Sequence, residues 1–410
     1  MTVVSSFVKR LLDRDGGVLR LAPAWVPRTF TSPGGRLKLA PGDLYAYGLE
    51  RGGICERWLA STTKADNGPL TTPDEGLSYI VDLQSGERCL LKDAVAELGD
   101  LLLGEDVMET YGGWQVLCKF FDNSGPLPLH MHPGDEQVAP LGKQGKPEAY
   151  YFPPQLNAIQ HSAPYTYFGL NPGTTKEEFI RCLQRWDEGD NGVLSLSRAY
   201  QLQLGTGWDI PPGILHAPGS LVTYEPQRAS DVNVMFQSLV GDRPIPREWL
   251  IKDVPPEHRD NLAAIVELID WEANTAPDFK ERYFRPPLPA RDEEAMKAEG
   301  YREVWVTYGS PYFSAKELTV FPGRSVTLTD PEAYGVVVIQ GYGRFGSLAV
   351  SSPTMIRFGD WTEDELFVTR PAARAGVTIT NASQTEPLVL LKHFGPGNPE
   401  APASRPAGAQ

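Results

Sequence analysis

The sequence has few cysteines and histidines and no long apolar run. Only four cysteines and six histidines occur among 410 residues. The cysteines are widely scattered without a Cys-x-x-Cys pair, which suits reduced thiols better than a disulfide framework. The N-terminus has no sustained apolar segment, and no later run approaches the roughly 20 apolar residues of a membrane span. We therefore expect a soluble, unexported protein that is located in the cytoplasm.

Clusters of positive charge are also absent. The chain has 38 Lys and Arg against 52 Asp and Glu, a net charge of −14, and no basic stretch that could follow a phosphate backbone. We therefore expect neither nucleic acid nor an anionic membrane to be a partner. Nothing in the pattern indicates an oligomeric state.

The chain is instead rich in turn residues and short β-type segments. With 41% apolar residues, it is long enough for two domains or one large elaborated domain. Forty glycines and 37 prolines separate short alternating segments that are rich in β-branched and aromatic residues, the profile of a β-sandwich or barrel. Helical periodicity is confined mainly to residues 92–104, 174–186 and 257–273, the second with Thr174 or Thr175 as its cap. The predicted fold is therefore mainly β.

Composition also indicates where the parts of the chain begin and end. We expect an N-terminal domain at 1–240 with a helical insert at about 170–190, and a helical, Pro-rich connector at 241–300. A second strand-rich unit is expected at 301–395 and a loose Pro/Ala-rich tail at 396–410.

One stretch, LPLHMHPGDEQVAPLGKQGKPEAYYF at 127–152, has the pattern of a metal site. In a strand, His130 and His132 would project from the same face. Glu148 opens the next strand-like segment, and an antiparallel hairpin would bring its carboxylate beside the pair. His216 follows a turn in DIPPGILHAPG and opens another strand-like segment. Three imidazoles and a carboxylate suit a divalent transition metal with open positions.

A packing role is the alternative interpretation of these histidines. An isolated His-x-His pair is more often part of a surface or a core than a ligand pair. The concentration favours the metal, because three of only six histidines lie in strand-like contexts with a carboxylate between them.

At these residues the sequence resembles the type I mannose-6-phosphate isomerases of the cupin superfamily. The family's metal strand reads approximately L-S-x-Q-x-H-P-x-D-E, and this chain has LPLHMHPGDE. Its G-K-x-E-x-W/Y and P-A-G-x-x-H-A segments correspond to GKPEAYY and PPGILHA, and ICERWLAS and YEPQRASDVNV are similar to flanking segments. The resemblance covers about residues 54–236. It implies two cupin domains, jelly-roll β-sandwiches or barrels, with the metal in the first.

The resemblance also implies residue roles and shows departures. The metal ligands fall on His130, His132, Glu148 and His216, with His130 where the family usually has glutamine. The family's lysines fall on Lys119 and Lys146, and Glu225 takes the place of an acid in the strand after the last histidine. Pro128 replaces a serine implicated in gripping phosphate, and Met235 replaces an arginine implicated in catalysis.

The expected function is metal-dependent aldose–ketose isomerisation of a sugar or sugar phosphate through an enediolate. Such chemistry needs a base near C2 and positive charge at the developing oxyanion. Glu225 is the candidate base, Lys146 is the candidate for proton transfer or charge support, and zinc is the first choice of metal, with manganese, iron or nickel as alternatives. Structural roles remain open for both residues: Lys146 as a solvated loop lysine and Glu225 as a structural partner.

Two other functions remain open. A set of three histidines and one glutamate also occurs in cupin oxygenases that use iron or manganese. A noncatalytic sugar-binding or regulatory relative is the third possibility, with Met235 marking lost catalysis. The second unit has one histidine, His393, and is expected to be metal-free and to cover the exposed sheet of the first barrel.

Overall fold

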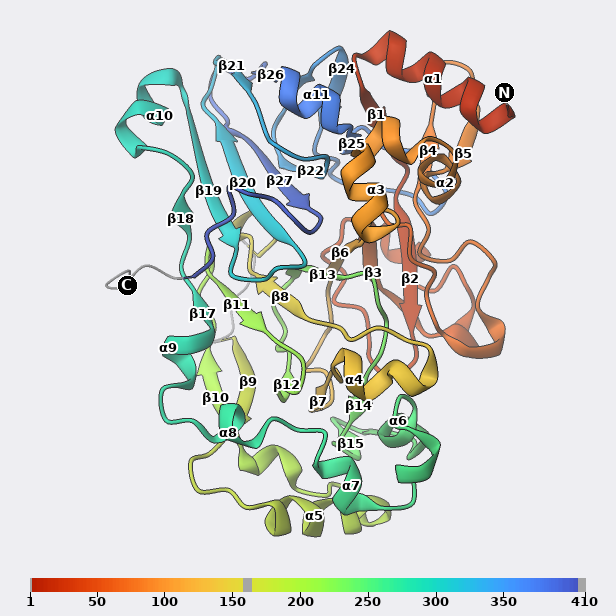
Figure 1. The fold of residues 1–410 in the computed structure, drawn as a ribbon, viewed down its shortest axis with the longest axis vertical. Helices are drawn as coiled ribbons and strands as arrows, with labels where there is room; N and C mark the ends of the chain where they lie inside the picture. The colour runs from red at the N-terminus through yellow and green to blue at the C-terminus, as the bar shows by residue number, and fades with distance from the viewer. Residues whose placement is uncertain (1, 158–163, 405–410) are drawn as a thin grey trace.

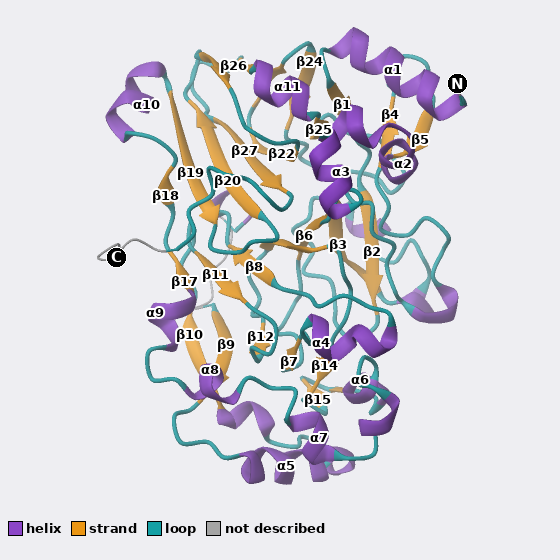
Figure 2. Cartoon of the chain, viewed as in Figure 1, coloured by secondary structure: helices purple, strands orange, loops and turns teal. Residues whose placement is uncertain are grey.

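The computed structural model describes residues 2–157 and 164–404. Four antiparallel sheets form two β-sandwiches, one in each half of the chain (Figure 1; Figure 2). The N-terminal sandwich lies in the lower part of Figure 1 and the C-terminal sandwich in the upper part, where residues 3–20 and 79–111 of the N-terminal half also lie. The predicted mainly β, two-cupin fold is therefore confirmed.

The N-terminal half contains a seven-stranded and a five-stranded sheet. The order in the larger sheet is β17 (Phe284–Arg285), β11 (Gly207–Ile210), β8 (Glu148–Tyr151), β13 (Thr223–Arg228), β6 (Val116–Phe121), β3 (Gly53–Leu59) and β2 (Ala24–Arg28). The order in the smaller sheet is β10 (Ser197–Gln201), β9 (Tyr165–Leu170), β12 (His216–Ala217), β7 (His130–Met131) and β14 (Val234–Met235). Aromatic residues such as Tyr150 and Phe168 pack between these two sheets.

The C-terminal half repeats this arrangement with a seven-stranded and a four-stranded sheet. The larger sheet runs β1 (Val18–Arg20), β25 (Glu365–Val368), β22 (Tyr334–Gln340), β27 (Leu388–Phe394), β20 (Ser314–Val320), β19 (Tyr301–Thr307) and β18 (Leu288–Pro289). The smaller runs β21 (Ser325–Leu328), β26 (Val377–Asn381), β23 (Tyr342–Phe345) and β24 (Leu348–Ser351). Two short hairpins, β4 (Tyr79–Val81) with β5 (Arg88–Leu90) and β15 (Leu239–Val240) with β16 (Arg243–Pro244), lie outside the sandwiches.

The two seven-stranded sheets pack against each other through a continuous apolar core. Phe120 and Tyr224 from the first sheet meet Val304, Val337 and Leu391 from the second. The second half therefore covers a face of the first, as the sequence led us to expect.

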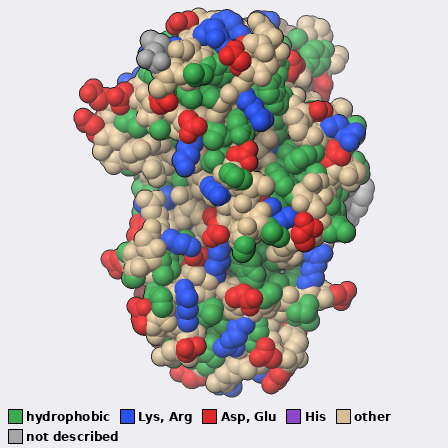
Figure 3. All heavy atoms as spheres, turned by 90° about the vertical axis from the view of Figure 1, so that its right-hand side faces the viewer, with side chains coloured by type: hydrophobic (Ala, Val, Ile, Leu, Met, Phe, Trp, Pro, Cys, Tyr) green, Lys and Arg blue, Asp and Glu red, His purple; other side chains and the backbone are tan. Residues whose placement is uncertain are grey.

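Helices cover the remaining faces and the ends of the sheets. They are α1 (Val3–Asp15), α2 (Leu91–Leu103), α3 (Glu105–Tyr111), α4 (Asp135–Val138), α5 (Lys176–Gln184), α6 (Glu248–Ile251), α7 (Leu262–Val266), α8 (Trp271–Thr275), α9 (Phe279–Tyr283), α10 (Glu293–Glu299) and α11 (Arg370–Ala375). Helices α5 to α7 pack their apolar side chains against the outer face of the five-stranded sheet, at the bottom of Figure 1. None of the helices in the described ranges combines the length and the apolar character that crossing a membrane requires. Basic, acidic and apolar side chains are interspersed on the face shown in Figure 3.

Capping residues decide where several helices begin. Helix α5 starts in the predicted insert with a capping box between Thr175 and Glu178. The single helix predicted at 257–273 is instead two short helices, because Asn261 caps α7 and Asp270 caps α8. The sequence pattern did not predict α1, which Thr2 caps through a hydrogen bond from the Ser5 N–H.

The chain crosses between the two sandwiches near residue 20 and again between residues 285 and 288. Strand β1 pairs with β25 in the C-terminal sheet, although it precedes the rest of the N-terminal sandwich. Within the connector, β17 extends the first large sheet and β18 the second. In the described part of the tail, the Pro402 carbonyl accepts a hydrogen bond from the Gly309 N–H; residues 405–410 lie outside the described residues. The exact domain limits stay a prediction.

Candidate metal centre

Two facing sheets bring the predicted ligands together. His130 and His216 are register partners on β7 and β12 of the five-stranded sheet, and His132 follows the end of β7. Glu148 comes from the opposite, seven-stranded sheet, where β8 pairs with β11 and β13. The predicted hairpin between the histidine strand and the glutamate strand is therefore wrong, because the carboxylate reaches the histidines across the interior of the sandwich.

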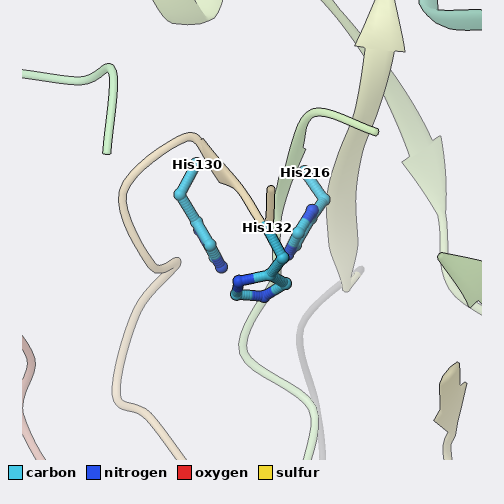
Figure 4. Close-up of side chains that lie close together, drawn as sticks. All are labelled: His130, His132 and His216. Carbon is cyan, nitrogen blue, oxygen red and sulfur yellow. The ribbon is translucent and has the colours of Figure 1, made fainter. Parts of the chain in front are cut away.

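The three imidazole rings converge on one point (Figure 4). Their ligand atoms all lie within 4.8 Å of one another, and all three residues are buried. Each Nδ1 lies next to a backbone carbonyl: His130 at 2.7 Å from Pro128, His132 at 2.6 Å from Val232, and His216 at 2.8 Å from Ile214. Since a carbonyl only accepts, Nδ1 carries the proton in each ring and Nε2 presents a lone pair. This is the arrangement that orients histidines as metal ligands.

The carboxylate of Glu148 faces two of these lone pairs. Its Oε2 lies 3.0 Å from Nε2 of His132, and its Oε1 lies 3.1 Å from Nε2 of His216. Nε2 of His216 is a buried atom without a hydrogen-bond partner, and it faces Oε1 of Glu148. Buried acceptors that face one another are unfavourable unless a cation lies between them. The donor set and its unsatisfied atom therefore fit a divalent transition metal.

Burial keeps these ligands in the protonation states that metal binding needs. Burial lowers the pKa of His132 to about 3, and Lys146 adds to the shift. Burial and the neighbouring His216 also hold the pKa of His130 well below its ordinary value. For Glu148, burial alone would raise the pKa, but Lys146 and His132 hold it well below the usual range. His130 and His132 are therefore neutral and Glu148 is ionised, the forms in which these side chains bind metals.

Lys146 and Glu225 lie directly beside the ligands. Nζ of Lys146 is 2.8 Å from Oε2 of Glu148, 3.1 Å from Nε2 of His132 and 3.5 Å from Oε1 of Glu225. Glu225 lies on β13, where its carboxylate is also 3.2 Å from Nζ of Lys119. Burial and the nearby Glu148 raise the pKa of Glu225 to about 8. Two groups able to move protons thus stand next to the candidate ligands.

A pocket opens onto this cluster. Three of the candidate ligands, His130, His132 and Glu148, line it, and so do Lys146 and Glu225. Pro128 and Met235, where the related family has serine and arginine, also contribute to the wall. The sequence had therefore identified positions around one cavity.

Other wall residues were not identified as site residues from the sequence. The hydroxyl of Tyr150 donates to Oε1 of Glu148 at 2.5 Å, from the same face of β8. Arg28, Glu56 and Asp231 form a charged group at the cavity wall. Tyr150 could have been identified from the sequence, because it lies two positions after Glu148 and therefore on the same face of the strand. Arg28 lies outside the stretch that resembles the family, so no pattern in the sequence indicated it.

Solved structures share this fold. No protein-family model and no curated protein matches the sequence. The structure is similar to that of a putative mannosephosphate isomerase from Archaeoglobus fulgidus, with 15% identity, a TM-score of 0.60, and coverage of 93% of this chain and 98% of that one. It is also similar to a zinc-bound mannose 6-phosphate isomerase, with 12% identity, a TM-score of 0.62, and coverage of 93% and 100%. The Bacillus subtilis mannose 6-phosphate isomerase gives 16% identity, a TM-score of 0.58, and coverage of 92% and 99%.

Fold and site together define a double-cupin protein with a candidate metal centre in its N-terminal half. Its fold is that of the mannose-6-phosphate isomerases, and identities of 12 to 16% make it a divergent example of that fold. The resemblance seen in the sequence is confirmed at the level of the fold.

Proposed function

We propose that this protein is a metal-dependent aldose–ketose isomerase that acts on a sugar or sugar phosphate. The observation that carries the proposal is the convergence of three Nε2 lone pairs and the Glu148 carboxylate beside Lys146 and Glu225 in one cavity. The similarity to solved mannose-6-phosphate isomerases supports the choice of reaction.

His130, His132, Glu148 and His216 would hold the metal. A bound divalent ion supplies positive charge to the oxygens of a sugar whose proton moves between C1 and C2. Zinc is the first candidate, since a similar structure contains it, and manganese, iron and nickel fit the same donors.

Glu225 and Lys146 are the proposed proton-transfer residues. A carboxylate at the cavity wall can accept the C2 proton, and its contact with Lys146 at 3.5 Å lets the ammonium offset the charge of the ionised form. Lys146 also lies where it can donate a hydrogen bond to a developing enediolate oxygen. Both side chains are held by neighbours on separate strands, which limits their motion.

Metal content is the first test. Untagged wild-type protein is compared with His132→Ala and His216→Ala by elemental mass spectrometry, with His258→Ala as the matched control, because His258 lies outside the cavity wall. We expect near-stoichiometric metal in the wild type and in the control, and none in the two ligand variants. No metal in the wild type, even after incubation with each of the four ions, would contradict the proposal.

Turnover assays then distinguish the isomerase from the oxygenase and from the noncatalytic sugar-binding protein. The loaded protein is incubated with aldoses and their phosphates, with and without oxygen. Interconversion that does not depend on oxygen supports the isomerase. Oxygen uptake would point to the oxygenase, and ligand stabilisation without turnover would point to a binding protein.

A further inference from the structure

The positive charges in the cavity wall are already neutralised by carboxylates. Among the described lining residues, three are cations, Arg28, Lys119 and Lys146, and four are carboxylates, Glu56, Glu148, Glu225 and Asp231. Even with a proton on Glu225, three carboxylates oppose the three cations. The wall therefore has no excess of positive charge, and a divalent ion would add charge only beside Glu148 and the histidines.

Arg28 shows this pairing most clearly. Its Nε lies 2.8 Å from Oε1 of Glu56, and one terminal nitrogen lies 3.2 Å from Oε2 of the same carboxylate. That terminal nitrogen is also 3.4 Å from Asp231, and the other donates to the Asn67 side chain at 2.9 Å. The Arg28 side chain is 4% exposed. Its planar fork, the usual tool for a phosphate, is thus occupied by two acids.

The two lysines are held in the same way. Lys119 lies 3.2 Å from Glu225 and 3.7 Å from Glu56. Lys146 lies 2.8 Å from Glu148 and 3.5 Å from Glu225. Both lysines are buried, so each would have to leave two carboxylates in order to bind another anion. Separating a buried pair in this way is strongly unfavourable.

Alternating donors and acceptors of this kind match hydroxyl groups. A hydroxyl both donates and accepts, so one sugar hydroxyl can bridge an ammonium and a neighbouring carboxylate. A phosphate group near neutral pH offers mainly acceptors and negative charge, so each neighbouring carboxylate would repel it. The wall therefore favours a neutral polyhydroxy compound over its phosphate ester.

We propose that the substrate is a neutral, unphosphorylated sugar; this rests on the proposed isomerase function and narrows its substrate class. The apolar side chains of Pro128 and Met235 in the cavity wall also favour a neutral substrate, since neither can bind a phosphate. The specificity-determining groups are Glu56 and Asp231, which engage Arg28 and keep it from anions.

An adjoining hollow contains a further cation, Arg243, that could bind a phosphate and so contradict this substrate proposal. Arg243, with Ser32 and Ser124, lines a space that shares Phe30 with the metal cavity. The guanidinium of Arg243 donates to the Ser32 hydroxyl, a neutral group. If a phosphorylated substrate bound, its phosphate would lie here, although the carboxylate of Asp242 lines the same space. Arg243→Gln removes this charge without touching the wall of the metal cavity.

The test compares matched pairs on the metal-loaded full chain. Mannose, glucose and fructose are assayed for interconversion against their 6-phosphates, and kcat/KM is determined for each. We expect a preference of at least about tenfold for the neutral sugars, since unfavourable like-charge contacts of this kind cost a kcal/mol or more. A preference for the phosphates overturns the proposal, and loss of that preference in Arg243→Gln would show that the adjoining hollow binds the phosphate.

A binding measurement separates this proposal from the function itself. Sorbitol and sorbitol 6-phosphate, open-chain analogues of the two substrate classes, are titrated calorimetrically into the loaded protein. If no sugar turns over but sorbitol binds more tightly than its phosphate, the isomerase proposal fails and the specificity proposal stands. Tighter binding of the phosphate, or binding of neither compound, overturns the specificity proposal.

A substitution at Met235 tests whether the charge balance of the wall causes the preference for neutral sugars. Met235→Arg adds an unpaired guanidinium to the wall and is expected to raise kcat/KM for the 6-phosphates relative to the neutral sugars by about tenfold. Met235→Gln, polar but uncharged, controls for loss of the thioether and is expected to leave the ratio as in the wild type. An unchanged ratio in folded, metal-loaded Met235→Arg would contradict the proposed role of charge balance.

Discussion

Nε2 of His216 and Oε1 of Glu148 lie 3.1 Å apart, and each presents a lone pair to the other. They come from two different sheets, which the sandwich core holds together. The protein thus keeps buried acceptors in close contact, an arrangement that becomes favourable when a cation is bound. The first prediction follows from this contact.

Metal binding should stabilise the folded protein. With free metal at about 100 times its Kd, the gain in unfolding free energy is about 2.7 kcal/mol, because only the folded chain presents the complete site. Thermal denaturation with and without the ion, and after a chelator, measures this shift. We expect the same shift in His258→Ala and none in His216→Ala; equal shifts in both variants would show that the ion binds elsewhere.

Tyr150 should support metal binding through Glu148. Tyr150→Phe removes the hydroxyl that donates to Oε1 of Glu148. Loss of a hydrogen bond that orients a metal ligand typically weakens metal affinity by about 10- to 100-fold. Tyr151→Phe is the matched control, since Tyr151 is on the other face of β8 and donates to Glu317 at 2.6 Å. Metal titration by calorimetry gives both affinities. Similar affinities in the two variants would contradict the role of Tyr150.

Glu365 should make stability depend on pH. Burial raises its pKa from 4.5 to about 7, although Arg57 partly opposes the shift. Because the folded state holds the proton more tightly, the stability that this group contributes is complete below pH 4.5. It falls as the pH rises to about 7 and is constant above that. The loss across this window is about 3 kcal/mol.

Substitution isolates this contribution. Glu365→Gln cannot ionise and should reduce the loss of stability between pH 4.5 and 7, as measured by urea denaturation. Glu363→Gln, a change at an exposed neighbour, should keep the pH dependence of the wild type. Parallel curves for the wild type and Glu365→Gln would refute the assignment.

The two halves should depend on their shared core. Leu391 is fully buried between the two seven-stranded sheets, so Leu391→Ala is expected to cost about 2 to 5 kcal/mol of unfolding free energy. Leu101→Ala, at a position 43% exposed, should change it by less than about 0.5 kcal/mol. Denaturant unfolding measures both. A Leu391→Ala variant as stable as Leu101→Ala would show that the core between the sheets contributes little.

Several features of the site were predictable from the sequence because they depend on local pattern. Two histidines two positions apart share one side of a strand, so His130 and His132 could be assigned together. Glu148 and His216 could be added because each opens a strand-like segment. The capping box at Thr175 and Glu178 was visible for the same reason, since it involves residues three apart.

Other features depend on contacts that no local pattern encodes. The sequence suggested a hairpin between the histidine strand and Glu148, whereas β8 lies in the opposite sheet. Arg28 is 91 positions from Lys119, and both reach Glu56 only because β2, β3 and β6 are neighbours in the same sheet. The crossing of β1 into the C-terminal sheet has the same origin, because pairing between distant strands is decided by the packing of the whole sheet.

The sequence by itself therefore determined the mainly β character, the four candidate ligands and their kind of chemistry, because composition and strand periodicity act over a few residues. Only the tertiary structure decided that the ligands meet between two sheets and that every lysine and arginine on the described cavity wall has a carboxylate partner. The physical reason is that electrostatic pairing depends on distance in space, and the residues that neutralise Arg28, Lys119 and Lys146 come from separate strands and loops.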